Sequence, residues 1–459
     1  MKRSLITLLL AAATFIGVSA QTAVELRTDL SRRLFFSDLM SLDTLQLDTL
    51  YDFWNDYVLA YPKNELSWRN LYEISHALKF KNDKQKYYVM GRMEQAIPDS
   101  YTFNYCAYDS HYEFAKYPNG DKFAERAIEL LPEDSPANDY ERWITYLYRE
   151  KFDHDTTQLT NLLTRYFEKG YYPAAALQYH FNELQGMDEG AVYLGIYEGD
   201  IIGKLILQLV KGVHCDKILY CESNAHNRPY LEALFRRIGL PGDFFNLEGL
   251  CAQTSEQKEE LLFTIRYICE HSMRPVYTSA NCIQSLIRGD GLPDDLKGCF
   301  YNEGLTMHYS ATPYDNKAVK RRNVEERYRL EYLRLSFQPS VNEKTNTLCF
   351  TQYSSIMAFK YLLVFYDLMP YYKAYSSERH AWLNSLFTDI LTQMRKNKLG
   401  GFSLNGRFFG IEASEEGGFH YEVREIPIEY VREDPREDEA TRQKRKANSQ
   451  LLLKTEPIE

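Results

Sequence analysis

The chain has few of the residues that interrupt regular structure. Its 459 residues include 23 Gly, 16 Pro and 4 Trp. So little Gly and Pro excludes a collagen-like chain or one dominated by linkers, and it favours helices. Basic residues are also in the minority, because 54 Lys and Arg face 64 Asp and Glu and the formal net charge is -10. Without a basic field, nucleic-acid binding is not expected as a main role.

The short motifs of common enzyme classes are absent as well. There is no Gly-x-Ser-x-Gly elbow, no His-Glu-x-x-His helix and no phosphate-binding loop. Two histidines and two cysteines lie between 214 and 226, but Cys215 and Cys221 are expected to flank a strand, which does not form a zinc knuckle. We therefore name no catalytic residue, no metal and no cofactor, and we favour a protein that is not an enzyme over one that is.

The first twenty residues have the pattern of a secretory signal peptide. Lys2 and Arg3 precede an apolar stretch from Leu5 to Ile16, and small residues follow up to Ala20. This pattern predicts export, with cleavage after Ala20. The mature chain is expected to be periplasmic or secreted.

Two later apolar segments, 201–210 and 356–368, are short and carry Lys or Asp, so neither is expected to span a membrane after the signal is removed. Export places the eight cysteines in an oxidising compartment, where disulfides form. Their pairing cannot be deduced from sequence and is left open.

From residue 30 to 188 the sequence predicts helices, because apolar residues recur three and four apart. Pro62, Pro98 and Pro132 are 36 and 34 residues apart, each where one helix should end and the next begin. The segment around Trp68 resembles the aromatic start of a tetratricopeptide unit. We expect tetratricopeptide-like α-helical hairpins that stack in antiparallel pairs. A generic helical array is the alternative, since the small residues of such units are mostly missing.

Three short apolar runs follow Gly190 and alternate with helical segments. They span 191–197, 217–221 and 275–278, and each has the length and composition of a buried strand. This alternation predicts an α/β module over 189–315 with a mostly parallel sheet.

Polar residues follow each of these strands. Ligands of open α/β sheets bind beyond the carboxyl ends of the parallel strands, so these residues are candidates to bind a sugar, a peptide or a cation. The alternative is that they cap the helices that follow. The candidate ligand-binding residues are Glu198, Asp200, Glu222, Ser223, Asn224, Ser279 and Asn281.

The C-terminal third is expected to form helices followed by a β-hairpin, because Asn405-Gly406 separates two apolar runs. The last residues are charged and contain no aromatic, which predicts disorder. The predicted fold class is α+β multidomain. Its parts are a signal peptide (1–20), an α-helical repeat-like domain (21–188), the α/β module (189–315), a helical segment (316–399), a β-hairpin region (400–431) and a charged tail (432–459).

Several patches of the α/β module resemble a known family in order and approximate spacing. They are Val192-Tyr193-Leu194 leading to Gly199-Asp200, then Arg274-Pro275-Val276-Tyr277, and Glu303-Gly304-Leu305. The family consists of bacterial envelope proteins described as a domain of unknown function or as protein O-mannosyltransferase-like. The resemblance is to their soluble C-terminal region, which has tetratricopeptide-like helices, and not to their multi-pass membrane half. It therefore implies the architecture and a place in the bacterial envelope, but no transferase activity.

Two classes of function follow from these observations. The favoured one is an exported soluble interaction or scaffold protein of the cell envelope, which holds an envelope protein or glycan. The alternative is an envelope glycan-binding module or enzyme that acts at the polar residues beyond the strands.

Overall fold

The computed structural model describes most of the chain between residues 29 and 425. The ranges are 29–40, 42–79, 86–110, 121–150, 156–195, 198–221, 227–240, 257–279, 296, 298–337 and 348–396, and the backbone alone of 401–404, 407–413 and 419–425. The predicted signal peptide and charged tail lie outside these ranges. No helix within them is long and apolar enough to cross a membrane. The chain divides into two compact units, residues 1–136 and 137–459.

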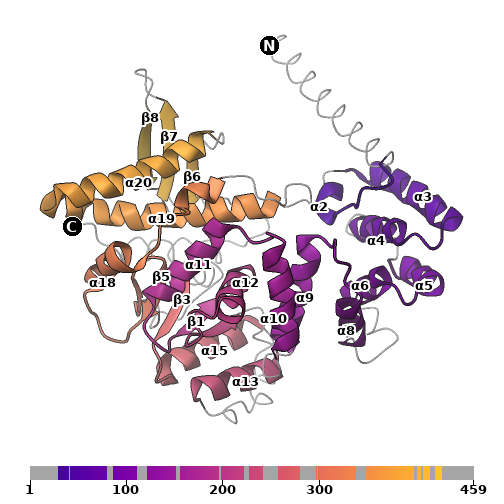
Figure 1. Cartoon of the computed structure of the whole chain (residues 1–459), viewed down its shortest axis with the longest axis horizontal. Coiled ribbons are helices and arrows are strands. Elements are labelled where there is room, and N and C mark those ends of the chain that lie inside the picture. The colour runs from indigo at the N-terminus through magenta and orange to yellow at the C-terminus, as the bar shows by residue number, and fades with distance from the viewer. Residues whose placement is uncertain are drawn as a thin grey trace, which may run out of the picture. The chain divides into compact units, whose positions relative to one another are not determined.

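The first unit is built from helices (Figure 1). They are α2 (Phe36–Leu39), α3 (Thr44–Ala60), α4 (Glu65–Lys79), α5 (Lys86–Ala96), α6 (Tyr101–Asp109) and α8 (Asp121–Glu129). Helix α3 packs on α4, α4 on α5, α5 on α6, and α6 on α8. The fully buried side chains of Trp54, Trp68 and Tyr72 form the centre of this unit.

Local sequence signals fix where these helices begin. The side chain of Asp43 accepts a hydrogen bond from the Gln46 amide, and the Gln46 side chain accepts one from the Asp43 amide, which makes a capping box at the start of α3. Ser100 caps α6 by accepting from the Phe103 amide at 3.0 Å. Pro62 and Pro98 lie in the turns before α4 and α6, as the sequence predicts.

Contacts between helices of this unit repeat along the chain. Three hydrogen bonds join residues that are 37 positions apart in each case: the Thr102 amide to Glu65 at 3.1 Å, the Tyr72 hydroxyl to Asp109 at 2.6 Å, and Arg92 to Asn55 at 2.6 Å. The first two join α4 to α6 and the third joins α5 to α3. Helix α6 therefore lies against α4 much as α5 lies against α3.

The second unit contains a five-stranded sheet in the order β2-β1-β3-β5-β4. Its strands are β1 (Val192–Gly195), β2 (Ile218–Cys221), β3 (Val276–Ser279), β4 (Phe300–Asn302) and β5 (Thr306–Tyr309). The three predicted strands are confirmed, and β1 pairs in parallel with both β2 and β3.

The other two strands make the sheet mixed rather than mostly parallel, which corrects the sequence-based expectation. Strand β5 is antiparallel to β3 and to β4. Strands β4 and β5 are joined by a tight turn in which Gly304 has φ +124°, and so short a connection permits only antiparallel pairing. Their sequences, Phe-Tyr-Asn and Thr-Met-His-Tyr, are too short and too polar to predict buried strands.

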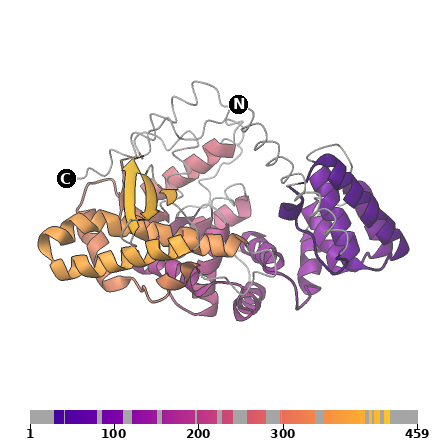
Figure 2. The same cartoon turned by 90° about the horizontal axis from the view of Figure 1, so that it is seen from above.

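Helices surround this sheet and continue beyond it. They are α9 (Ala137–Glu150), α10 (Thr157–Glu168), α11 (Ala174–Gly186), α12 (Glu198–Leu205) with the π-turn η1 (Ile206–Val210), α13 (Arg228–Ile238), α15 (Gln257–His271), α18 (Asn316–Arg322) with η4 (Asn323–Arg327), η5 (Leu333–Phe337), α19 (Leu348–Tyr375) and α20 (Ser377–Lys396). Helices α19 and α20 run side by side (Figures 1 and 2). The predicted domain boundary at 188/189 falls inside this unit, because α9, α10 and α11 cluster with the sheet.

A second, three-stranded antiparallel sheet follows the helices, visible as the yellow arrows of Figure 2. It consists of β6 (Gly401–Leu404), β7 (Arg407–Ala413) and β8 (Phe419–Glu425). Leu404 pairs with Arg407, so β6 and β7 form the antiparallel pair that the Asn-Gly signal predicts. Residues 426–431, the end of the predicted β-hairpin region, lie outside the described residues. Taken together, the described residues are mostly helical with a small mixed sheet and a small antiparallel one, which is an α+β arrangement.

Candidate functional site

Two of the seven predicted ligand-binding residues have described side chains. Asp200, in α12, is 6% exposed and Ser279, at the end of β3, is fully buried. Glu198 begins α12, but its side chain lies outside what the structure describes, and so do Glu222, Ser223, Asn224 and Asn281. The predicted gathering of all seven at one sheet edge therefore stays a prediction.

Asp200 belongs to a buried ionic cluster, which we define as His180, Glu183, Asp200 and Lys204. Its carboxylate accepts a hydrogen bond from the Tyr193 hydroxyl at 2.9 Å and lies 3.7 Å from the Lys204 ammonium. Its backbone carbonyl accepts a second bond from Lys204 at 2.8 Å. Asp200 is thus directed toward the helices that cover the Tyr193 face of the sheet.

Glu183 is the centre of the cluster. One of its carboxylate oxygens, Oε2, lies 2.6 Å from Lys204 Nζ and 2.9 Å from His180 Nδ1. The other oxygen accepts from the Tyr179 hydroxyl at 3.0 Å and lies 3.3 Å from the Tyr193 hydroxyl. The side chains of His180, Glu183 and Lys204 have no exposed surface. Every oxygen of this buried carboxylate is therefore hydrogen-bonded.

Burial and charge set the protonation states of the cluster. Burial alone would raise the pKa of Glu183, but the Lys204 ammonium and the His180 hydrogen bond outweigh it and lower the pKa to about 2. Burial and the charge of Lys204 lower the pKa of His180 to about 4. Burial also lowers the pKa of Lys360, whose ammonium lies 4.9 Å from the centre of the Tyr179 ring. At neutral pH the cluster holds an ionised Glu183 and an uncharged His180.

Helical spacing and one glycine bring the cluster together. His180 and Glu183 are three apart on α11, and Asp200 and Lys204 are four apart on α12, so each pair shares a helix face. The two helices pack closely at Gly203, where an added β-carbon would lie 2.2 Å from His180 Cδ2. A side chain at position 203 would therefore push Lys204 away from Glu183.

His180, Glu183 and Asp200 also form a set of metal-ligand types, since their ligand atoms lie within 4.8 Å of one another. Imidazole and carboxylates are the ligands of zinc and related ions. The Lys204 ammonium, however, is in direct contact with Glu183 Oε2 and lies 2.9 Å from His180 Nδ1. A resident cation thus supplies the charge that a metal would bring. This arrangement serves to hold α11 on α12, and the sequence signals for it are the His-x-x-Glu and Asp-x-x-x-Lys spacings.

A second group of polar side chains, which includes Tyr277 and His308, lies on the same face of the sheet as Tyr193. Tyr193 pairs with Tyr277, and Tyr277 pairs with His308, so the three side chains form a row across β1, β3 and β5. The His308 ring stacks on Tyr277 with centroids 4.5 Å apart. Sequence analysis missed His308 because β5 itself was not predicted.

Hydrogen bonds order the protons of this second group. The Tyr314 hydroxyl donates to Glu303 at 2.5 Å, and His308 Nδ1 lies 3.2 Å from the same hydroxyl. Since the hydroxyl proton is given to Glu303, the hydroxyl oxygen accepts from a protonated Nδ1. A neutral His308 therefore keeps its lone pair on Nε2.

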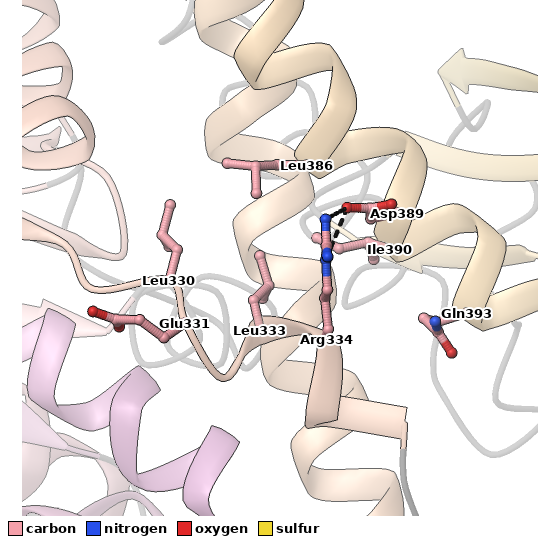
Figure 3. A pocket seen from close by; sticks show the side chains of 8 residues that line it. All are labelled: Leu330, Glu331, Leu333, Arg334, Leu386, Asp389, Ile390 and Gln393. Carbon is pink, nitrogen blue, oxygen red and sulfur yellow. Dashed lines mark hydrogen bonds and ion pairs between the residues drawn. The ribbon is translucent and has the colours of Figure 1, made fainter.

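The cavity shown in Figure 3 is separate from both groups. It has a volume of about 250 Å³, between η5 and α20. Its lining is Leu330, Glu331, Leu333, Arg334, Leu386, Asp389, Ile390 and Gln393. At its rim the Arg334 guanidinium pairs with Asp389, with Nε 3.0 Å from the carboxylate. Half of its lining residues are leucine or isoleucine, and neither Asp200 nor Ser279 lines it.

Known proteins add no identification. The chain matches no protein-family model, no curated protein and no solved structure. The resemblance to the envelope family stays a prediction, and function has to be inferred from residues and geometry.

Proposed function

We propose that the protein is an exported, non-catalytic interaction or scaffold protein of the bacterial cell envelope. In this proposal it acts in the periplasm or outside the cell, and its first unit holds an envelope protein or glycan. The signal-peptide pattern of residues 1–20 and the family resemblance support the location.

The observation that carries the proposal is the repeated contact between helices of the first unit. Residues 37 positions apart are hydrogen-bonded between α4 and α6 and between α3 and α5. This period agrees with the 36 residues between Pro62 and Pro98. Stacked helical hairpins of this length are typical of tetratricopeptide-like units, which bind partners on extended surfaces. The buried ionic cluster supports a non-catalytic role, because its charged groups are already paired with one another.

One observation favours the alternative, a ligand site near the sheet edge. Thr306 pairs with Ser279, and Glu303 lies opposite Thr306 where β4 turns into β5. Glu303 Oε2 and Thr306 Oγ1 are buried and make no hydrogen bond. Buried polar atoms of this kind are usually satisfied, so a ligand hydroxyl or water bonded to both would account for them.

Partner capture from the envelope fraction tests the proposal. The full mature chain is compared with a variant in which exposed tyrosines of the first unit, Tyr61 and Tyr88, are replaced by serine. The control replaces Tyr375, which is 76% exposed in the second unit. We expect a captured partner to be lost with Tyr61→Ser and Tyr88→Ser and kept with Tyr375→Ser.

Mass spectrometry of the exported protein should find Gln21 at its start, and a full-length cytoplasmic product would contradict export.

A partner that is lost instead with Thr306→Val would favour the alternative. If none of these chains captures a specific partner, the scaffold function is contradicted.

A further inference from the structure

The first unit holds a stretch of its own chain by the backbone. We call residues 29–40 the N-terminal segment. The side-chain amide of Asn70, in α4, donates to the Arg32 carbonyl at 3.0 Å, and its oxygen accepts from the Leu34 amide at 2.8 Å. Asn70 has no exposed surface. The side chain of a buried asparagine thus forms hydrogen bonds with two main-chain groups of an irregular segment.

This contact recognises an extended main chain and not a particular side chain. Arg32 to Phe35 have no helix or strand assignment, and Phe35 has the extended angles φ -116° and ψ 152°. The carbonyl of one residue and the amide two positions later lie on the same edge of an extended chain. The carboxamide pairs with that edge as a neighbouring strand would, so any extended peptide offers the same two groups.

Side chains of the segment add two apolar anchors. Leu34 and Leu39, five positions apart, are both fully buried. The Phe36 ring packs on His76 of α4, with ring centroids 5.1 Å apart. The segment therefore contacts α4 both by its backbone and by an aromatic side chain.

The segment stabilises its own shape. Asp29 accepts from the Ser31 hydroxyl at 2.6 Å, and Asp38 accepts from the Phe35 amide at 3.1 Å and pairs with Arg32 at 3.3 Å. These bonds stay within the segment and do not depend on the helices beneath it.

The helices beneath the segment also have ion-pair and aromatic contacts of their own. Arg69 forms an ion pair with Glu73 at 2.9 Å, and its guanidinium lies 3.5 Å from the centre of the Tyr105 ring. These contacts join α4 to itself and to α6 without the segment. If the segment left, both partners would retain these bonds, and Asn70 would be open to another main chain.

We propose that the surface of α4 around Asn70 is a binding site for an extended peptide of a partner protein, and that the N-terminal segment occupies it as an internal competitor. The partner peptide carries a leucine in an extended stretch, preceded by basic residues, and a second leucine five positions later, as the segment does. This inference rests on the proposed scaffold function and names the chemistry of its partner.

A synthetic peptide with the sequence of residues 29–40 is the probe, carrying a fluorophore and measured by anisotropy. The control peptide has serine in place of both leucines. Each is titrated against the mature chain, a chain with Leu34→Ser and Leu39→Ser, and the same chain with Asn70→Ala added. A tethered competitor has an effective concentration near the millimolar range. The native chain should therefore bind the peptide at least about 10-fold more weakly than the chain with Leu34→Ser and Leu39→Ser, whose own segment no longer occupies the site. Asn70→Ala should weaken that binding about 10-fold, and the control peptide should not bind.

Hydrogen exchange on the native chain keeps the test decisive if the leucine variant does not fold. Excess probe peptide should speed exchange of the Leu34 amide, and the control peptide should not. Absence of both peptide binding and faster exchange would overturn the inference, as would binding that is unchanged by Asn70→Ala. Partner capture that depends on Tyr61 and Tyr88 while the peptide does not bind would reject this inference and leave the proposed function standing.

Discussion

Lys204 shows how one buried side chain can be essential to an arrangement that contributes little net stability. Its ammonium contacts Glu183, His180 and the Asp200 carbonyl, and it lies 4.1 Å from the centre of the Tyr193 ring. Moving such charges out of water costs about as much as their attraction returns. The loss of one partner, however, leaves the others buried and unpaired.

Lys204→Met should therefore destabilise the protein by about 3–5 kcal/mol, because Glu183 and Asp200 lose their cation. The free energy of unfolding from urea titration measures this. Lys373→Met, at an exposed position of α19, is the matched control and should change it by less than about 0.5 kcal/mol. Equal effects of the two substitutions would contradict the role assigned to the cluster.

Lys204→Ala leaves room as well as a set of metal-ligand side chains. Zn²⁺ should raise the thermal midpoint of this variant, since a ligand that binds only the folded state stabilises it. The native chain should show no such rise, because its ammonium stands where the metal would bind. A double variant with His180→Ala is the control, and a zinc response that survives in it would argue against the site.

The cluster also predicts loss of stability in acid. The unfolded chain takes up a proton at His180 near pH 6.5, whereas the folded chain resists it until about pH 4. More protons are then bound by the unfolded state, so the free energy of unfolding falls as the pH drops from 6.5 to 4. Glu183 continues the loss, since its pKa falls from 4.5 in the unfolded chain to about 2 in the folded one.

Urea midpoints between pH 4 and 7 test this for the native chain and for His180→Gln. The variant should show a shallower dependence over that range. A dependence identical to that of the native chain would mean that His180 does not titrate as described.

At the scale of elements, two glycines in helices differ in whether a side chain would fit at their positions. A β-carbon at Gly203 in α12 would overlap His180 and the Tyr172 hydroxyl, at 2.2 and 2.5 Å. Gly91, inside α5, has nothing within 4 Å of the same position. Gly203→Ala should destabilise by about 1–3 kcal/mol through overpacking. Gly91→Ala should stabilise by about 0.5–1 kcal/mol, because alanine favours the helix. Unfolding curves of the two variants that shift in the same direction would refute this contrast.

The elements that sequence analysis predicted are those with strong local signals. Apolar runs gave β1, β2 and β3, and the Asn-Gly pair gave β6 and β7. Strands β4 and β5 were missed because residues such as Asn302 and His308 are stabilised by neighbours in the sheet and not by local propensity.

The candidate site was likewise predicted only where a local signal exists. Asp200 was selected as a polar residue beyond a strand, and the structure places it in a buried cluster. Its partners Glu183 and Lys204 were not selected, because their meeting depends on the close contact of α11 and α12 at Gly203. The His-x-x-Glu and Asp-x-x-x-Lys spacings place each pair on one helix face, but neither spacing indicates that the two helices meet.

At the scale of the whole molecule, the ionic cluster, both sheets and the cavity all lie in the second unit. Residues 137–459 should therefore fold without the first unit. Expressed alone, this part should unfold cooperatively in urea and lose that stability on Lys204→Met, as the full chain does. A chain that is unfolded or aggregated without residues 1–136 would contradict this.

The strand order has a consequence for the chain as it is made. Strand β1 lies between β2 and β3, but Val276 of β3 follows Cys221 of β2 by 55 positions (276 - 221). At about 5–20 residues per second, synthesis of that stretch takes roughly 3–11 s. During this interval one edge of the apolar strand β1 can pair with β2 while its other edge has no partner, and an unpaired edge of this kind recruits strands from other chains. We expect the nascent chain to be prone to aggregate in those seconds, and a chaperone that binds extended apolar segments to protect residues 192–195.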